Sequence, residues 1–205
     1  MRGYRQVYTE EQNSAPMNPD EVLASIEEVA PRQGLPIIGP KRGRFLDEVI
    51  KQHNPSAILE VGTLVGYSAI RMARHLKEEG RVTCVELSGE RARTARANFE
   101  RAGLSDRISV IVGDAKSVLP KLTGSFDMVF LDAVKEDYLF YLKSIEGLLR
   151  PGSIVVADNV KSHSEAVAPY LDYVRNSGRY SSNYREALPN FGSGPGDAVE
   201  ISVRL

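Results

Sequence analysis

The sequence predicts an α/β protein built on a doubly wound, Rossmann-like sheet with helices on both faces. Short apolar runs alternate with segments of helical spacing five times in succession, which is typical of a parallel sheet with crossover helices. The apolar runs at 128–131 and 154–157 are continuous rather than alternating, as expected of strands covered on both faces. A chain of 205 residues is long enough to form one large domain around such a sheet.

Residues 1–19 are predicted to form a flexible arm, because they are polar and show no apolar period. Two roles stay open for Tyr4 and Tyr8 in this arm: covering an aromatic substrate, or packing against a second copy of the chain in a homodimer. Residues 20–52 are expected to form an N-terminal helical cap, and residues 1–205 together a single domain.

The cap contains two predicted helices. Asn18 is a favoured N-cap residue and Pro19 suits the first helical position, so the first helix begins there and extends to about Ala30. A loop at 31–39, rich in Gly and Pro, precedes a second helix at 42–52.

The remaining elements follow from the alternation. Strands are predicted at 57–61, 82–87, 108–113, 126–131 and 153–157. Helices are predicted at 67–79, 89–102, 115–121, 136–149 and 163–175. Segments 179–188 and 197–204 break the alternation and are predicted to be two late strands, paired as an antiparallel hairpin.

Composition and charge argue against several classes of protein. Hydrophobic residues make up 42% of the chain and charged residues 26%, as in ordinary soluble domains, and the net charge of −1 gives no support to a nucleic-acid partner. No apolar run approaches the roughly 18 residues that a membrane helix needs. The N-terminus lacks the apolar core of a signal peptide, so a cytoplasmic location is expected.

The most specific local signal is the segment from Glu60 to Ser68, which reads as the end of a strand, a glycine turn and the start of a helix. Glycine lets the backbone approach a ligand, and a helix N-terminus offers free N–H groups to an anion. Leu64, between Gly62 and Gly66, stands where a dinucleotide fingerprint has its second glycine. A nucleoside ligand with a smaller anionic end is therefore favoured, and a nicotinamide-dependent oxidoreductase is the alternative.

Acidic residues follow the predicted strands, at the edge of the sheet where doubly wound proteins bind ligands. Glu86 lies 24 residues after Gly62, about where an acid that binds a ribose is expected. Asp114 follows the third strand and either accepts a hydrogen bond from an adenine amino group or caps the helix that begins at Ala115.

A second polar group follows the fourth and fifth strands. Asp132, Asp158 and Asn159 are oxygen donors of the kind that Mg²⁺ prefers, and neighbouring strand ends are close enough for one ion to reach all three. Lys135 stands three residues after Asp132. An ammonium beside a divalent cation is destabilised, which favours the neutral amine that a general base needs.

The chain resembles the metal-dependent O-methyltransferases, the family of catechol and caffeoyl-CoA O-methyltransferases. The resemblance rests on four segments in order and spacing: 39–43 (GPKRG), 60–69 (EVGTLVGYSA), 131–138 (LDAVKEDY) and 157–160 (ADNV). It implies a seven-stranded sheet with an antiparallel last strand, and transfer of a methyl group from S-adenosylmethionine to a phenolic oxygen.

The same resemblance implies roles for individual residues. Those expected to bind the cofactor are Ile38, Glu60, Gly62, Gly66, Tyr67, Ser68, Glu86, Asp114 and Asp132. Those expected to ligate Mg²⁺ or Mn²⁺ are Asp132, Asp158 and Asn159, with Lys135 as the general base.

The departures from the family concern the small-molecule acceptor. The catechol-specific animal members carry a His-Trp pair where this chain has Ala133 and Val134, and a glutamate where it has Asn183. These departures argue against catechol itself, and the predicted acceptor is a vicinal diol of the catechol type.

Overall fold

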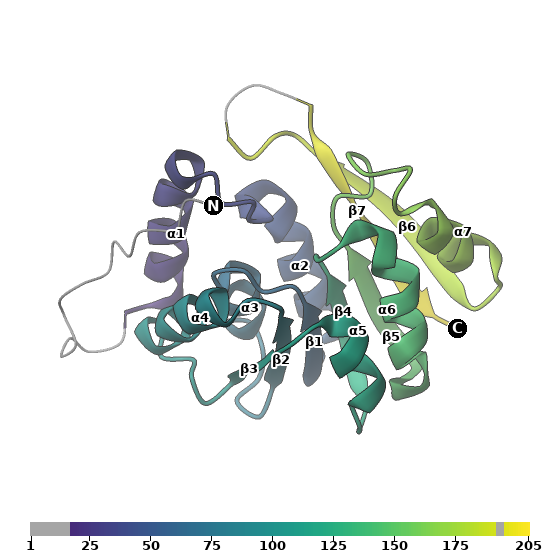
Figure 1. Ribbon diagram of the computed structural model, residues 1–205, viewed down its shortest axis with the longest axis horizontal. Coiled ribbons are helices and arrows are strands. Elements are labelled where there is room, and N and C mark those ends of the chain that lie inside the picture. Colours follow the sequence, from purple (N-terminus) through teal and green to yellow (C-terminus); the bar gives the residue numbers. More distant parts are fainter. Residues whose placement is uncertain (1–16, 192–194) are drawn as a thin grey trace.

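The computed structural model describes residues 17–191 and 195–205; most of the predicted arm, with Tyr4 and Tyr8, lies outside them. A seven-stranded sheet lies between two layers of helices (Figure 1). The strands are β1 (Ala57–Val61), β2 (Arg81–Glu86), β3 (Ile108–Val112), β4 (Phe126–Leu131), β5 (Leu149–Ala157), β6 (Tyr180–Ala187) and β7 (Asp197–Arg204).

The strand order is β3-β2-β1-β4-β5-β7-β6. Strands β1 to β5 are parallel, and β7 runs antiparallel to both β5 and β6. The predicted doubly wound sheet, its late hairpin and its antiparallel last strand are thereby confirmed. The winding reverses between β1 and β4, and a sheet of this kind binds ligands outside the carboxyl ends of its strands at such a point.

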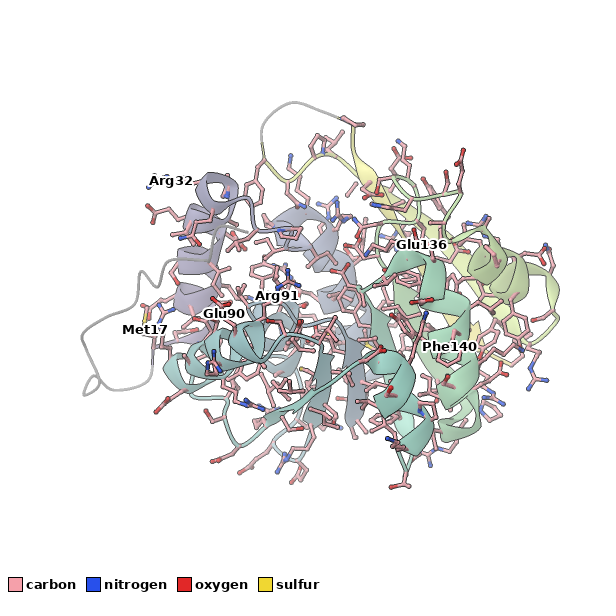
Figure 2. All side chains as sticks on the ribbon, viewed as in Figure 1. Met17, Arg32, Glu90, Arg91, Glu136 and Phe140 are labelled. Atoms are coloured by element: carbon pink, nitrogen blue, oxygen red, sulfur yellow. The ribbon has the colours of Figure 1, made fainter. Side chains whose placement is uncertain are left out.

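Helices cover both faces of the sheet because side chains alternate along each strand. Ile58 belongs to the apolar cluster that also contains side chains of α1 (Pro19–Gln33), α2 (Gly39–His53), α3 (Tyr67–Ala73) and α4 (Gly89–Arg101). Leu59, its neighbour, faces the layer that contains α6 (Tyr138–Ile145) and α7 (Ala168–Asn176), with the short α5 (Ala115–Val118) beside them. The outer helix faces carry exposed side chains such as Arg32, Glu90 and Phe140 (Figure 2). No helix in the described part is long and apolar enough to span a membrane.

Several helices differ from their predicted bounds. The helix predicted at 67–79 ends at Ala73, the one predicted at 42–52 begins at Gly39, and three further differences have identifiable reasons. The helix predicted at 163–175 begins at Ala168, because Pro169 fits the first turn of a helix but not its interior. The helix predicted at 136–149 is divided into 3₁₀ turns on either side of α6, and β5 begins already at Leu149. The first helix continues through Pro31 and ends before Gly34, which adopts the left-handed conformation with φ 64°.

Candidate active site

A cavity of about 720 Å³ opens at the carboxyl ends of the parallel strands, a size within the usual range for ligand sites. Its lining includes most of the residues predicted from the sequence: Ile38, Gly62, Tyr67, Ser68, Glu86, Asp114, Asp132, Lys135 and Asn159. The other three predicted residues, Glu60, Gly66 and Asp158, are buried and do not line the cavity.

Both glycines of the turn between β1 and α3 have positive φ, 91° at Gly62 and 86° at Gly66. Different neighbouring atoms leave no room for a side chain at the two positions. A Cβ on Gly62 would lie 2.3 Å from the backbone oxygen of Asp132. A Cβ on Gly66 would lie 2.4 Å from the ring of Phe99 in α4. The first glycine therefore permits a backbone contact across the cavity floor, and the second permits helix packing; their contact with a cofactor stays a prediction.

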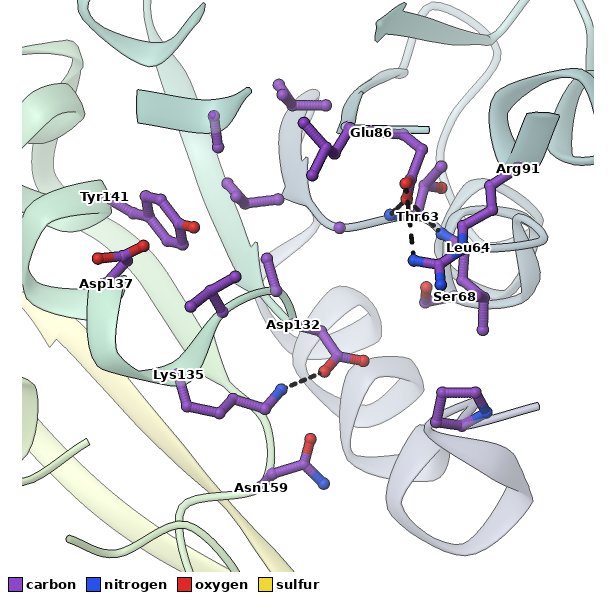
Figure 3. A pocket seen from close by; sticks show the side chains of 18 of the residues that line it. Thr63, Leu64, Ser68, Glu86, Arg91, Asp132, Lys135, Asp137, Tyr141 and Asn159 are labelled. Atoms are coloured by element: carbon purple, nitrogen blue, oxygen red, sulfur yellow. Dashed lines mark hydrogen bonds and ion pairs between the residues drawn. The ribbon is translucent and has the colours of Figure 1, made fainter. Parts of the chain in front are cut away.

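Glu86 holds the glycine turn in place (Figure 3). Its Oε2 atom accepts hydrogen bonds from the backbone N–H groups of Thr63 (3.3 Å) and Leu64 (3.0 Å), and Oε1 accepts from that of Ser88 (3.0 Å). Leu64 has a positive φ of 51°, which is uncommon for a residue other than glycine. Glu86 thus helps to fix this backbone conformation in addition to facing the cavity.

Glu60 lies beneath the same turn. It accepts hydrogen bonds from the hydroxyl groups of Thr63 (2.5 Å) and Ser68. Complete burial raises the pKa of Glu60 to about 7, although these hydrogen bonds act in the opposite direction. The Ser68 hydroxyl is therefore already engaged on the side away from a ligand.

Tyr67 joins the cavity to the helical cap. Its hydroxyl donates to Glu27 of α1 (2.5 Å) and accepts from Arg71 (3.0 Å), whose guanidinium also donates to Asp47 of α2 at 2.6 Å. Gly43 of α2 leaves room for that guanidinium, because a Cβ there would lie 2.6 Å from Arg71 Nε. Helices α1, α2 and α3 are thus linked by one buried polar network behind the cavity wall.

Three predicted residues meet at the other end of the cavity, where the side chains of Asp132, Lys135 and Asn159 are directed into the same space (Figure 3). Lys135 Nζ donates to Asp132 Oδ1 at 2.7 Å and to Tyr138 Oη at 2.8 Å. Tyr138 in turn donates to the backbone oxygen of Asp158 at 3.1 Å. Lys135 is therefore held between the ends of β4 and β5.

Asp158 is buried against Arg42. Arg42 Nη2 donates to Asp158 Oδ2 at 3.1 Å, whereas Nε lies 2.8 Å from Oδ1 without the geometry of a hydrogen bond. Burial and the charge of Asp132 raise the pKa of Asp158, and Arg42 opposes this shift. Two carboxylates that disfavour each other's ionisation form a site that a cation would stabilise.

Asn159 adopts the left-handed conformation, with φ 61°, and donates from Nδ2 to Asp197 Oδ2 at 2.8 Å. Burial alone would raise the pKa of Asp197, but hydrogen bonds from Asn159 and Ser162 help to lower it to about 2. Among the described residues there is no cluster of three or more His, Cys, Asp and Glu suited to a metal. The predicted ligand set, two carboxylates and one amide, is of a different composition.

Asp114 acts as a helix cap, one of the two roles that the sequence left open. Its Oδ1 atom accepts from the backbone N–H of Lys116 at 2.9 Å, at the start of α5. The Lys116 ammonium forms an ion pair with Asp137 at 2.7 Å, and both residues line the cavity. The adenine contact predicted for Asp114 stays a prediction.

The sequence reasoning missed Arg42, Asp197 and Asn190. Arg42 lines both the main cavity and a second one of about 500 Å³, whose wall also contains Asn190 and Phe191. Asn190 accepts from Lys41 N (2.8 Å) and donates to Ile38 O, fastening the connection between β6 and β7 to the start of α2. Of these three residues, only Arg42 could have been found from the sequence, because it belongs to the segment at 39–43 that carries the family resemblance.

Comparisons with known proteins agree with this geometry. A family model described as O-methyltransferase matches residues 12–179. Catechol O-methyltransferase of Sus scrofa is 38% identical over 154 residues, which cover 72% of this chain and 82% of that protein. The Bos taurus enzyme of the same name is 33% identical over 181 residues, covering 84% of this chain and 66% of its own longer sequence.

A solved structure gives the same result. An O-methyltransferase from Bacillus cereus in complex with SAH (S-adenosylhomocysteine) superposes with a TM-score of 0.81 and 29% sequence identity, over 91% of each chain. The family match covers most of the chain and agrees with the sheet topology and with the cavity at its strand ends. This chain therefore belongs to the O-methyltransferase family.

Proposed function

We propose that this O-methyltransferase moves a methyl group from S-adenosylmethionine to one hydroxyl of a small vicinal aromatic diol, with a divalent cation, Mg²⁺ or Mn²⁺, at the acidic end of the cavity. One observation carries the proposal. A single cavity has a glycine turn with a ribose-type acid, Glu86, at one end, and two oxygen donors beside a lysine, Asp132, Asn159 and Lys135, at the other.

The cofactor end fits a nucleoside. S-Adenosylmethionine supplies a methyl group on a positively charged sulfur. Three of the roughly four lone-pair positions of the Glu86 carboxylate are occupied by backbone N–H groups, and Arg91 Nη1 forms an ion pair with Oε1 at 4.0 Å. A ribose hydroxyl would use the remaining position at Oε1, beside that guanidinium. The second carboxylate oxygen of Asp114 makes no hydrogen bond to the described residues and is available to an adenine amino group. The family match favours this cofactor over the nicotinamide alternative.

The acidic end fits a hard cation. Asp158 Oδ1 is buried and accepts no hydrogen bond of good geometry, although it forms an ion pair with Arg42 at 2.8 Å, and the donor set of Asp132, Asp158 and Asn159 consists of oxygen atoms. These three residues would hold Mg²⁺, which favours ionisation of a hydroxyl group bound to it. A vicinal diol suits such a site because it offers two adjacent oxygens.

Lys135 is the residue placed to take the proton from the acceptor. The base must be the neutral amine, whose two N–H groups can donate to Asp132 and Tyr138, so that its lone pair is left for the proton of a hydroxyl group in the cavity. Ile38 and Tyr67 supply apolar walls that exclude water and hold the reactants in one orientation. Such positioning supplies a large part of the rate in bimolecular transfer.

The test combines binding with turnover. Calorimetry with S-adenosylhomocysteine and with NAD should show binding of the first and none of the second. Methylation of a panel of diphenols, followed by mass spectrometry, should stop in EDTA and return with Mg²⁺. Full activity in the presence of EDTA would show that the reaction needs no metal. Binding of NAD without binding of S-adenosylhomocysteine would contradict the proposed methyl transfer.

A further inference from the structure

Asp197 is a buried acid on β7 that no part of the proposed reaction uses, and it lies directly behind Asn159. It accepts five hydrogen bonds. Oδ1 accepts from the backbone N–H groups of Lys161 (3.3 Å), Ser162 (3.0 Å) and Ala198 (2.8 Å). Oδ2 accepts from Asn159 Nδ2 (2.8 Å) and Ser162 Oγ (2.6 Å). With every lone pair engaged, Asp197 is not free to bind a metal or to take a proton.

The contact with Asp197 decides which way the Asn159 amide faces. A carboxylate only accepts hydrogen bonds, so the amide atom 2.8 Å from Oδ2 must be the nitrogen. The oxygen of the same planar amide is then turned away from Asp197. Asn159 lines the cavity, and Figure 3 shows its side-chain oxygen on the side of Asp132.

We propose that Asp197 is a positioning residue that fixes the amide of Asn159 with its oxygen toward the cation and so sets the affinity of the divalent cation site. The inference rests on the proposed function, since it needs the metal. Residues that orient a metal ligand typically change affinity about 10–100-fold when they are replaced. A role in folding alone would lower stability and leave the affinity of the folded protein for a cation unchanged.

Replacement Asp197→Asn tests the positioning role. It also removes the charge that lies 3.8 Å from Arg42 Nη1, so it is compared with a control variant that removes a buried charge elsewhere on β7. The three backbone N–H groups require an oxygen at the Oδ1 position, so the new side-chain nitrogen takes the Oδ2 position. There it can only donate, and the Asn159 amide must rotate to accept from it, turning its own nitrogen toward the cation. We expect the Mn²⁺ dissociation constant of the full chain, measured by electron paramagnetic resonance without cofactor, to rise about 10–100-fold.

The matched control is Glu200→Gln. Glu200 is also a buried acid on β7, but it pairs with Arg175 (2.7 and 2.6 Å) and has no contact with Asn159. This variant should lose stability and keep its Mn²⁺ affinity. The rescue is the exchange Asn159→Asp with Asp197→Asn, which reverses the hydrogen bond and again turns an oxygen toward the cation, so most of the lost affinity should return.

The outcomes are distinct. Wild-type protein that binds no Mn²⁺ would overturn the metal-dependent function and this inference together. Binding by the wild type with an unchanged dissociation constant in Asp197→Asn would overturn the inference about Asp197 alone. If the double variant Asn159→Asp with Asp197→Asn binds Mn²⁺ as weakly as Asp197→Asn alone, the inference is also overturned. The loss of affinity would then not come from the orientation of the side chain at position 159.

Discussion

Glu86 is the residue whose replacement tests the cofactor end most directly. In Glu86→Gln the side chain keeps its length but has one acceptor oxygen in place of two. That oxygen can serve Thr63 and Leu64, as Oε2 does now, and the new NH₂ group then faces the N–H of Ser88 and the ribose. The N–H of Ser88 then loses its acceptor, and so does the ribose hydroxyl that we propose for Oε1.

The expected loss follows from the hydrogen bond to the ribose. A hydrogen bond to a charged group contributes about 1.5–3 kcal/mol, and a neutral one about 0.5–1.5 kcal/mol. Loss of one charge-assisted bond at Oε1 should therefore weaken S-adenosylhomocysteine binding by roughly 1.5 kcal/mol or more, which is about tenfold or more in the dissociation constant.

Isothermal titration with S-adenosylhomocysteine measures this change. Glu90→Gln is the control, because Glu90 is an exposed acid at the start of α4 and its replacement removes the same charge from the same region. A dissociation constant for Glu86→Gln equal to that of the control would place the ribose elsewhere in the cavity and refute the reasoning.

Three further predictions concern the base, the metal and a buried acid. Lys135→Met should lower kcat about 10²–10⁴-fold with little change in S-adenosylhomocysteine affinity, and an unchanged kcat would exclude Lys135 as general base. Asp158→Asn keeps the shape but removes the charge of a proposed ligand, so turnover should be lost while calorimetry still detects cofactor binding; full turnover would place the metal elsewhere. Glu60→Gln mimics the protonated acid: because the folded pKa of about 7 exceeds the unfolded value of 4.5, the wild type loses stability as pH rises through this interval. In urea unfolding, the free energy of unfolding of the variant relative to the wild type should therefore rise by up to about 3 kcal/mol between pH 4.5 and pH 7. A difference between the two proteins that does not depend on pH would contradict this prediction.

The sequence predicted strand bounds well where an apolar run has clear boundary signals, and less well at β5, which begins at Leu149 rather than at residue 153. β1 (Ala57–Val61) and β4 (Phe126–Leu131) begin and end where predicted. Helix bounds were predicted less accurately. The helical spacing of apolar residues continues beyond the ends of the helices, into turns where tertiary contacts have already ended the helix. Pro169 was the one available signal for a later helix start, and the apolar period concealed it.

The candidate site was predictable to the extent that it lies at the ends of parallel strands. Most of the predicted residues line one cavity, because all these strand ends reach the same edge of the sheet. Asp197 could not be predicted in this way. It is 38 residues beyond Asn159, and only the insertion of β7 beside β5 brings the two together.

The lack of a side chain at Gly62 limits which mutations can alter the acceptor that the enzyme uses. The glycine turn touches the backbone of Asp132 so closely that any Cβ would collide with it, so the two ends of the cavity meet through main chain alone. Mutation at Gly62 cannot easily alter the spacing between the proposed cofactor end and the proposed metal end of the cavity. New acceptors are instead expected from exchanges at Val134, an exposed residue of the same cavity, and at Phe191, an exposed residue of the neighbouring cavity. Libraries of variants at those positions should broaden the range of acceptors while the methyl-transfer reaction stays the same.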